Sequence, residues 1–239
     1  MTELSEEPTR GLQADLEIFL RSCEDRHFLD FIEDVCQAEN FHRHADEEEF
    51  TEAINKFLKV DELPYALTPF QREKRTKQVY GQEREVNWIV ERPKIIRRDS
   101  QVTHESAVEP ALQLLADKRF TSANSEFLEA MEDFRHGDYG DCLTKTCSAL
   151  ESTMKIICDR RGWDYSEDDS AGQLVETVVS KSNLDGYFQQ TLIIVATLRN
   201  RLSKSHGAGT QEKTVPQHLA RYAINTTASN ILLLVEECM

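Results

Sequence analysis

The sequence predicts a mainly α-helical protein, in which a helical bundle follows a small α-rich region that contains a β-hairpin. Two observations lead to this prediction. Apolar residues recur every three or four positions over most of the 239-residue chain, which is the period of an amphipathic helix. Within residues 139–161 the spacing of these residues is four, three, four and three, as in the narrow seam of a helical bundle. The seam residues are Leu143, Cys147, Leu150, Met154 and Ile157.

The N-terminal region reads as three helices. Residues 9–38 form two of them, with a turn at Glu24–Asp25, and residues 46–58 form the third. His42 and His44 precede the third helix and alternate on a loop, where a metal ion would need further ligands. No tetrahedral ligand set is visible in the sequence, so we expect no metal site here.

Residues 61–105 differ in residue composition from the helical segments before them. Proline breaks helices, and the residues that follow are β-branched and aromatic, so we expect a β-hairpin or an extended arm in which 66–75 pair with 84–97. Basic residues with interleaved aromatic rings suit single-stranded nucleic acid. Lys and Arg also protect edge strands from aggregation. Because the charges occupy both strand faces, we favour the second explanation.

The C-terminal half is predicted to be helical to its end. The expected helices are 106–120, 125–136, 139–161 and 170–181, then one opened by Gly186 and a last one that starts with Pro216 at its first position. We expect Thr121–Asn124 to cap the helix at 125–136, and Asp138 to cap the helix at 139–161, because these residue types accept hydrogen bonds from free N–H groups.

Charge is distributed unevenly over the three regions into which we divide the chain, 1–60, 61–105 and 106–239. The net charge is −15; residues 1–60 carry 6 Lys and Arg against 16 Asp and Glu, whereas residues 72–98 carry 9 against 4. Such an acidic chain is not expected to bind duplex nucleic acid through a broad basic face, although a small basic site remains compatible with it.

Cysteine usage and hydropathy predict a cytoplasmic protein without a membrane segment. None of the six cysteines forms a Cys-x-x-Cys pair, and three lie inside an apolar helical pattern, which favours reduced thiols. No apolar run approaches the ~18 residues that a membrane helix needs. The N-terminus also lacks the basic and apolar regions of a signal peptide.

The strongest candidate site lies in the segment Leu198–Gly209. Arg199 and His206 are seven residues apart, which is about 700° of helical rotation, so both side chains return to nearly the same side of a helix. A cation, the amide of Asn200 and an imidazole can together hold a phosphodiester and move a proton beside it. Gly207 is expected to end the helix, with His206 in the last turn or just past it.

A structural explanation fits the same residues. An arginine near a helix C-terminus complements the helix dipole, and a histidine before glycine is often only a cap. Spacing alone does not decide between the two explanations.

Three motifs in the right order resemble the abortive-infection C-terminal domain of the HEPN superfamily, over residues 121–239. Asp138–Lys145 leads into Ala149–Ile157 like the first long helix of that domain. Leu198-Arg199-Asn200 with His206-Gly207 is similar to its second signature, an arginine followed after four to six residues by histidine, with six residues intervening here. Leu219–Asn225 resembles its closing helix. Ser203 stands where glycine is frequent.

The resemblance implies a HEPN-type bundle that forms a homodimer with two Arg/His motifs across a composite cleft. Many members are metal-independent endoribonucleases that act as toxins or defence effectors, and others are not catalytic. In a catalytic member, His206 would act as general base or acid, Arg199 would bind the non-bridging oxygens, and Asn200 would donate to the phosphate or orient His206. Lys204 is expected to supply attraction or surface charge.

Glu151 and Lys155 are supporting candidates with two interpretations. At positions i and i+4 of one helix they could form a surface ion pair worth ~0.3–0.5 kcal/mol. They could instead orient Arg199 from the facing helix.

Two functions therefore stay open: a HEPN ribonuclease, or a non-catalytic dimerisation and interaction module of a defence system. The expected partners are an RNA substrate, a second copy of the chain and a partner protein of a defence or toxin–antitoxin system. We expect neither a cofactor nor a metal.

Overall fold

The computed structural model describes residues 11–38, 41, 46–79, 82–98, 103–202 and 214–239. The chain divides into two compact units, Met1–Glu47 and Glu48–Met239. His42 and His44 lie outside the described residues. No helix in the described ranges is long and apolar enough to cross a membrane.

The first unit contains α1 (Leu12–Ser22) and α2 (Asp25–Gln37), so the turn expected at Glu24–Asp25 is confirmed. The rings of Phe19 and Phe31 join the two helices, with centroids 5.6 Å apart. On α2 the buried side chains are Leu29, Ile32 and Cys36, spaced as one face of a helix.

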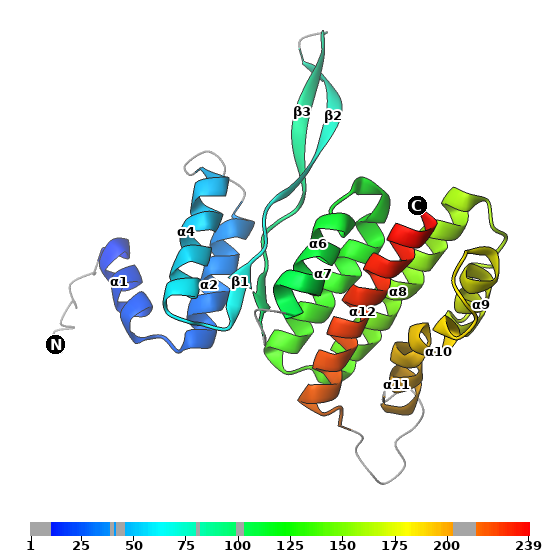
Figure 1. The fold of residues 1–239 in the computed structure, drawn as a ribbon. Coiled ribbons are helices and arrows are strands. Elements are labelled where there is room, and N and C mark those ends of the chain that lie inside the picture. The colour runs from blue at the N-terminus through cyan, green and yellow to red at the C-terminus, as the bar shows by residue number, and fades with distance from the viewer. Residues whose placement is uncertain (1–10, 39–40, 42–45, 80–81, 99–102, 203–213) are drawn as a thin grey trace, which may run out of the picture. The chain divides into compact units, whose positions relative to one another are not determined.

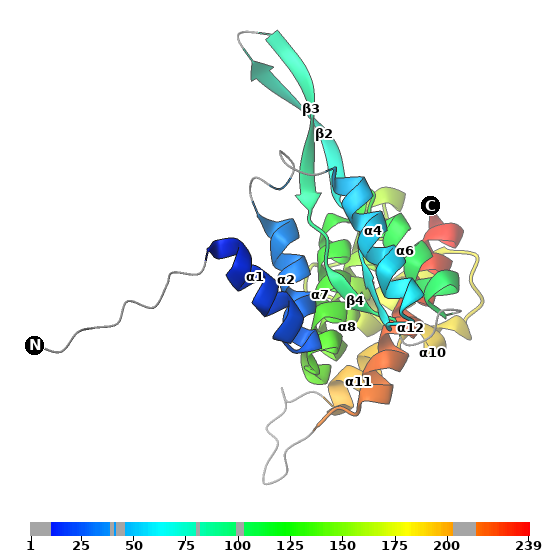
Figure 2. The same ribbon diagram turned by 90° about the vertical axis from the view of Figure 1, so that its left-hand side faces the viewer.

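All of α4 (Glu47–Val60) except its first residue belongs to the second unit, and two antiparallel strand pairs follow it, drawn in Figures 1 and 2. β1 (Tyr65–Leu67) pairs with β4 (Ile95–Arg97), and β2 (Gln71–Val79) pairs with β3 (Gln82–Glu91). The predicted hairpin is thus present, although its first strand is longer than expected and reaches Val79. In Figure 2 the free end of β2–β3 projects beyond the helices of this unit.

Much of the positive charge of the hairpin is neutralised locally. Lys74 and Glu85 pair diagonally across the two strands, with Nζ and Oε2 3.6 Å apart, and Arg75 bonds the carboxylate of Glu73. The guanidinium of Arg75 lies over the ring of Trp88, 5.5 Å from its centroid. These contacts agree with the explanation that the charges keep an isolated pair of strands in solution.

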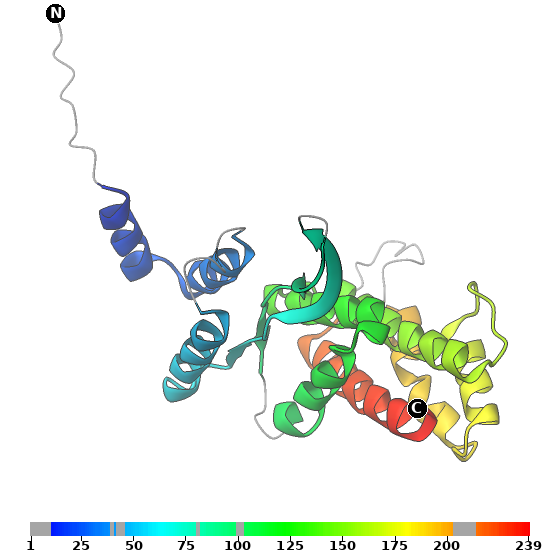
Figure 3. The ribbon, with the colours of Figure 1, turned by 90° about the horizontal axis from the view of Figure 1, so that it is seen from above.

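Helices form the rest of the second unit. In chain order they are the π-helical turn η1 (His104–Val108), α6 (Glu109–Leu115), the 3₁₀ turn η2 (Lys118–Phe120), α7 (Thr121–His136), α8 (Tyr139–Arg161), α9 (Ala171–Lys181), α10 (Phe188–Leu192), α11 (Ile194–Leu202) and α12 (Gln217–Cys238). α8 is central and packs against α7, α9, α11 and α12. Figure 3 shows α7, α8 and α12 as neighbouring long helices. The mainly α prediction is confirmed.

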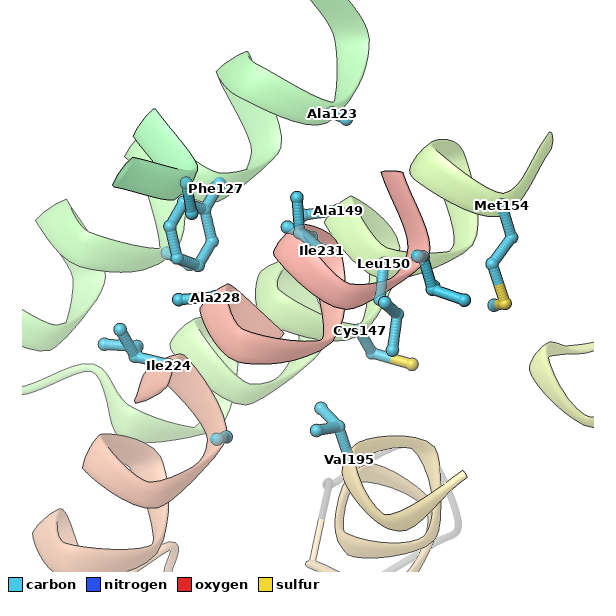
Figure 4. Close-up of a cluster of buried hydrophobic side chains, with 14 of the residues drawn as sticks. Ala123, Phe127, Cys147, Ala149, Leu150, Met154, Val195, Ile224, Ala228 and Ile231 are labelled. Atoms are coloured by element: carbon cyan, nitrogen blue, oxygen red, sulfur yellow. The ribbon is translucent and has the colours of Figure 1, made fainter. Parts of the chain in front are cut away.

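The core follows the seam that the spacing predicts. All five seam residues are at most 3% exposed. Figure 4 shows Val195 of α11 facing Cys147 and Leu150 of α8, with Phe127 of α7 beside α12. These side chains belong to one continuous buried cluster, and burial of such apolar surface contributes about 25 cal/mol per Å².

Two predicted caps differ from the structure. α7 already begins at Thr121, so Thr121–Asn124 is its first turn rather than a cap. Asn124 is buried there and exchanges amide hydrogen bonds with Gln71, which supplies the partner that a buried amide needs. Asp138 does precede α8, but its side chain makes no capping bond.

Three helix predictions also need correction. The segment 106–120 consists of a π turn, a short α-helix and a 3₁₀ turn. The helix expected from Gly186 onward is divided at Ile193 into α10 and α11. Pro216 is the N-cap of α12 rather than its first helical residue, with an extended backbone at φ −66° and ψ 143°.

Candidate functional site

Arg199 lies in the last turn of α11 and is anchored to α8. Its Nη1 donates to Oε1 of Glu151 at 3.0 Å, and the two side chains are 25% and 24% exposed. Of the two interpretations of Glu151, a surface pair with Lys155 or a contact with Arg199, the structure shows the contact with Arg199. Because both groups are largely shielded from water, this ion pair fixes the guanidinium more firmly than a surface pair does.

A second donor reaches the same carboxylate. The Sγ of Cys147, one helical turn before Glu151, donates to Oε1 at 3.3 Å. Burial, with the carboxylate of Glu151 as a smaller cause, raises the pKa of Cys147 to about 12, so the thiol stays protonated and remains a donor. The seam pattern predicted that Cys147 is buried, but we did not predict its contact with Glu151. The i, i+4 spacing of the two residues is the one feature of the sequence that could have indicated the contact.

Asn200 adds a contact on the outer side of the arginine. Its Oδ1 accepts a hydrogen bond from Nε of Arg199 at 3.3 Å. A guanidinium has five N–H groups, and these two bonds leave both hydrogens of Nη2 for a ligand. Glu151 and Asn200 thus hold the group while one edge stays available.

Arg199 lines a cleft of about 900 Å³ between the start of α8, the end of α11 and the start of α12. Its described lining contains one cation, Arg199, and two carboxylates, Asp138 and Asp141. The remaining lining residues are Gly137, Tyr139, Gly140, Thr144, Asn200, Leu202, Thr214, Val215, Pro216 and Gln217. Gly137 takes the left-handed conformation at φ 88°, which ends α7 and turns the chain directly into α8.

The pKa of Asp133 on α7 responds to the negative charges near the cleft. Burial, followed by repulsion from Asp141 and Asp138, raises the pKa of Asp133 to about 6. The cleft therefore combines one fixed cation with an acidic wall, and sequence reasoning did not identify these aspartates as its lining.

His206 and Lys204 lie outside the described residues. The chain leaves the described structure after Leu202 and re-enters it at Thr214, and both of these residues line the cleft. Both ends of the segment that carries His206 are thus at the same cleft as Arg199.

Lys155 does not join this group. Its Nζ donates to the backbone oxygen of Glu167 at 2.5 Å and to the carboxylate of Glu167 at 3.2 Å. Lys155 therefore holds the loop before α9. The structure shows Lys155 bonded to Glu167, and not to Glu151 or beside Arg199. In the described ranges, no group of three or more His, Cys, Asp or Glu side chains is arranged to hold a metal ion.

Residues 121–237 match the family model Abi_C, described as a HEPN-like domain. This part of the chain is a HEPN-like domain. The match extends from α7 to near the end of α12 and includes Glu151, Arg199 and His206, so the family resemblance drawn from the three motifs is confirmed. No curated protein and no solved structure matches the chain.

Proposed function

We propose that the HEPN-like domain is a metal-independent endoribonuclease that acts as an effector in abortive infection or as a toxin. One observation carries the proposal. Arg199 is held by Glu151 at a cleft where the segment bearing His206 both begins and ends. A phosphate-binding cation and a titratable imidazole are the groups that metal-free RNA cleavage requires.

The proposed reaction is an internal transfer at phosphorus. The ribose 2′-oxygen loses its proton and forms a bond to the phosphorus, the bond from phosphorus to the 5′-oxygen breaks, and that oxygen takes up a proton. The products are a 2′,3′-cyclic phosphate and a 5′-hydroxyl. His206 has the residue type to move one of these protons near neutral pH. The N–H groups at Nη2 of Arg199 would bind the non-bridging oxygens, where negative charge grows.

Glu151 is a positioning residue in this proposal. Its carboxylate accepts from Nη1 of Arg199 and is not among the described lining residues of the cleft, so it would orient the cation without occupying the cleft. Cys147 restrains the carboxylate in turn. Asn200, which is exposed, would either donate its amide N–H₂ to the phosphate or orient His206.

We further propose that two copies of the chain form the working unit. One arginine opposite Asp138 and Asp141 is a weak site for a polyanion, and a second copy would add its own Arg/His pair to the cleft. A two-fold interface is self-complementary, so it would place the two motifs on either side of one axis. Light scattering at tens of micromolar protein tests this, and a monomeric mass would contradict it.

The acidic cleft favours a second candidate, the non-catalytic interaction module. Here Arg199 would serve mainly to join α11 to α8 through Glu151, and the cleft would dock a partner protein of the defence or toxin–antitoxin system.

RNA integrity in cells separates the two functions. Wild-type protein, Arg199→Ala and His206→Ala are expressed under identical induction, with Arg201→Ala as a control, because Arg201 is an exposed arginine on the same helix. The ribonuclease proposal expects RNA fragmentation with wild type and Arg201→Ala and intact RNA with the other two. Fragmentation that persists in Arg199→Ala and His206→Ala at equal protein levels would overturn it.

A further inference from the structure

The cleft at Arg199 holds more hydrogen-bond acceptors than the proposed reaction uses. Its α8 wall carries Asp138, Asp141 and Thr144. A carboxylate accepts hydrogen bonds at both of its oxygens. The hydroxyl of Thr144 donates to the backbone oxygen of Gly140 at 3.1 Å, so its hydrogen is engaged and its oxygen remains an acceptor. The transfer at phosphorus gives none of these three side chains a role.

Donors and acceptors occupy different ends of this cleft. Arg199 is fixed beside Glu151, and the Oδ1 of Asn200 accepts from Arg199, which leaves the N–H₂ group of Asn200 as a donor. Asp141 lies ten residues before Glu151 on α8, roughly 15 Å along the helix axis at 1.5 Å per residue. A phosphate bound by Arg199 therefore lies away from Asp141, and the acceptor end is left for another part of the substrate.

Tyr139 adds a flat ring at the acceptor end. It is the first residue of α8 and lines the cleft. Its ring lies against that of the buried Phe134, with centroids 5.6 Å apart and planes tilted by 53°, and this contact restrains the ring. Nucleic-acid bases stack on such rings in proteins that bind single strands. The cleft volume of about 900 Å³ is near the upper end of the ~300–1,000 Å³ typical of small-molecule sites, so it has room for a base as well as a phosphate.

A wall of acceptors distinguishes bases by their N–H groups. The bases of single-stranded RNA are free to present their Watson–Crick edges to a protein. On that edge guanine has two adjacent donors, N1–H and N2–H₂, which match the two oxygens of one carboxylate. Adenine and cytosine each have one amino group beside acceptors, and uracil has one N–H between two carbonyl oxygens. Guanine is therefore the base that an aspartate at this wall binds best.

We propose that Tyr139 and Asp141 form a base site that selects guanine beside the scissile phosphate: the ring stacks on the base, and the carboxylate accepts N1–H and N2–H. Asp141 is preferred to Asp138 because it lies in the first turn of α8, where the helix fixes its backbone, whereas Asp138 precedes the helix. This inference rests on the proposed ribonuclease function and specifies its substrate. Neither residue moves a proton, and both determine specificity.

Cleavage of four matched RNAs by the purified full chain tests the site. Each RNA is a short oligouridine, labelled at its 5′ end, with guanosine, adenosine, cytidine or uridine at its centre. Initial rates and product lengths are measured. Wild type should cleave the guanosine RNA at least about tenfold faster than the other three, because one well-formed bidentate pair discriminates between bases by this order. The cut should lie next to the guanosine.

Asp141→Asn should remove the preference for guanosine. The asparagine keeps the size of the side chain but has one acceptor and one donor, the pattern that pairs with adenine. The rate on the guanosine RNA should therefore fall about tenfold relative to the rate on the adenosine RNA. Asp138→Asn is the matched control, because it removes the same charge from the same cleft, and it should keep the preference. Both aspartates are exposed, so neither change is expected to unfold the protein.

Substitutions of Tyr139 test the ring separately. Tyr139→Leu should slow cleavage of all four RNAs by a similar factor through a higher KM, because stacking tolerates every base. Tyr139→Phe keeps the ring and should cleave at wild-type rates.

The outcomes that contradict this inference differ from those that contradict the ribonuclease function. Equal rates on the four RNAs, or a guanosine preference that survives Asp141→Asn, would overturn the base site and leave the ribonuclease proposal standing. Wild-type rates in Tyr139→Leu would overturn the role of the ring. If wild type cleaves none of the four RNAs, the ribonuclease function is overturned and this inference with it.

Discussion

The Arg199 cleft and the cavity lined by Arg97, Arg98 and Arg221 differ in the charged residues of their described linings. Arg199 has a carboxylate partner on its own helix bundle, and two further aspartates line its cleft. The described lining of the cavity at Arg97, Arg98 and Arg221 contains no carboxylate. The comparison teaches that an arginine held by a carboxylate is oriented but partly neutralised, which suits a group that must be placed accurately.

The largest expected effect is on catalysis at the Arg199 cleft. Purified Arg199→Ala and His206→Ala should cleave RNA about 10²–10⁴-fold more slowly than wild type, the usual contribution of such groups. Arg201→Ala, which changes an exposed arginine on the same helix, should cleave at the wild-type rate. Initial rates on a short single-stranded RNA measure this. An equal loss in all three variants would contradict a specific role for Arg199 and His206.

Glu151→Gln should have an intermediate effect. The amide keeps the size of the side chain but removes the charge that holds Arg199, so we expect about 1–3 kcal/mol of lost stability together with slower cleavage. A double-mutant cycle with Arg199→Ala, followed by thermal melts, isolates the pair. Additive losses would mean that Glu151 does not orient the arginine. Lys155→Gln is the matched control, because its contacts are with Glu167.

A smaller effect is expected from Asp133→Asn. The pKa of Asp133 is raised to about 6 in the folded protein from 3.8, so its ionised form destabilises the fold at pH 7. The amide should therefore raise stability at pH 7 by up to about 1 kcal/mol after solvent screening. The gain should shrink as the pH falls through 6 and vanish below 3.8, where the carboxyl is protonated in both states. Melting temperatures of both proteins from pH 4 to pH 8 measure this, and a gain that is the same at every pH would contradict the raised pKa of Asp133.

The smallest expected effect is that of chelation. Cleavage in excess EDTA should equal cleavage without it, since the proposed chemistry uses only protein side chains. Activity that EDTA removes and Mg²⁺ or Zn²⁺ restores would refute the metal-free mechanism.

Local sequence patterns predicted much of the bundle. The four-three spacing of apolar residues in 139–161 predicted both the bounds of α8 and its buried face. An apolar stripe along one side of a helix is buried by packing against neighbouring helices. The cap of α9 is also local, although we did not predict it: Ser170 and Gln173 form a capping box within four residues. Local patterns gave wrong predictions where a residue has a partner far away in the sequence. Asn124 has the residue type of a helix cap, but it is buried and bonds Gln71.

The sequence by itself thus determined the helical class, the seam of α8 and the family of the C-terminal domain, since these depend on residues a few positions apart. Only the tertiary structure decided which charges meet. Glu151 pairs with Arg199 while Lys155, one turn further on, turns to Glu167. Arg97 and Arg221 lie far apart in the chain and come to one cavity because α12 packs beside η1 and α7, and no periodicity in the sequence encodes that contact.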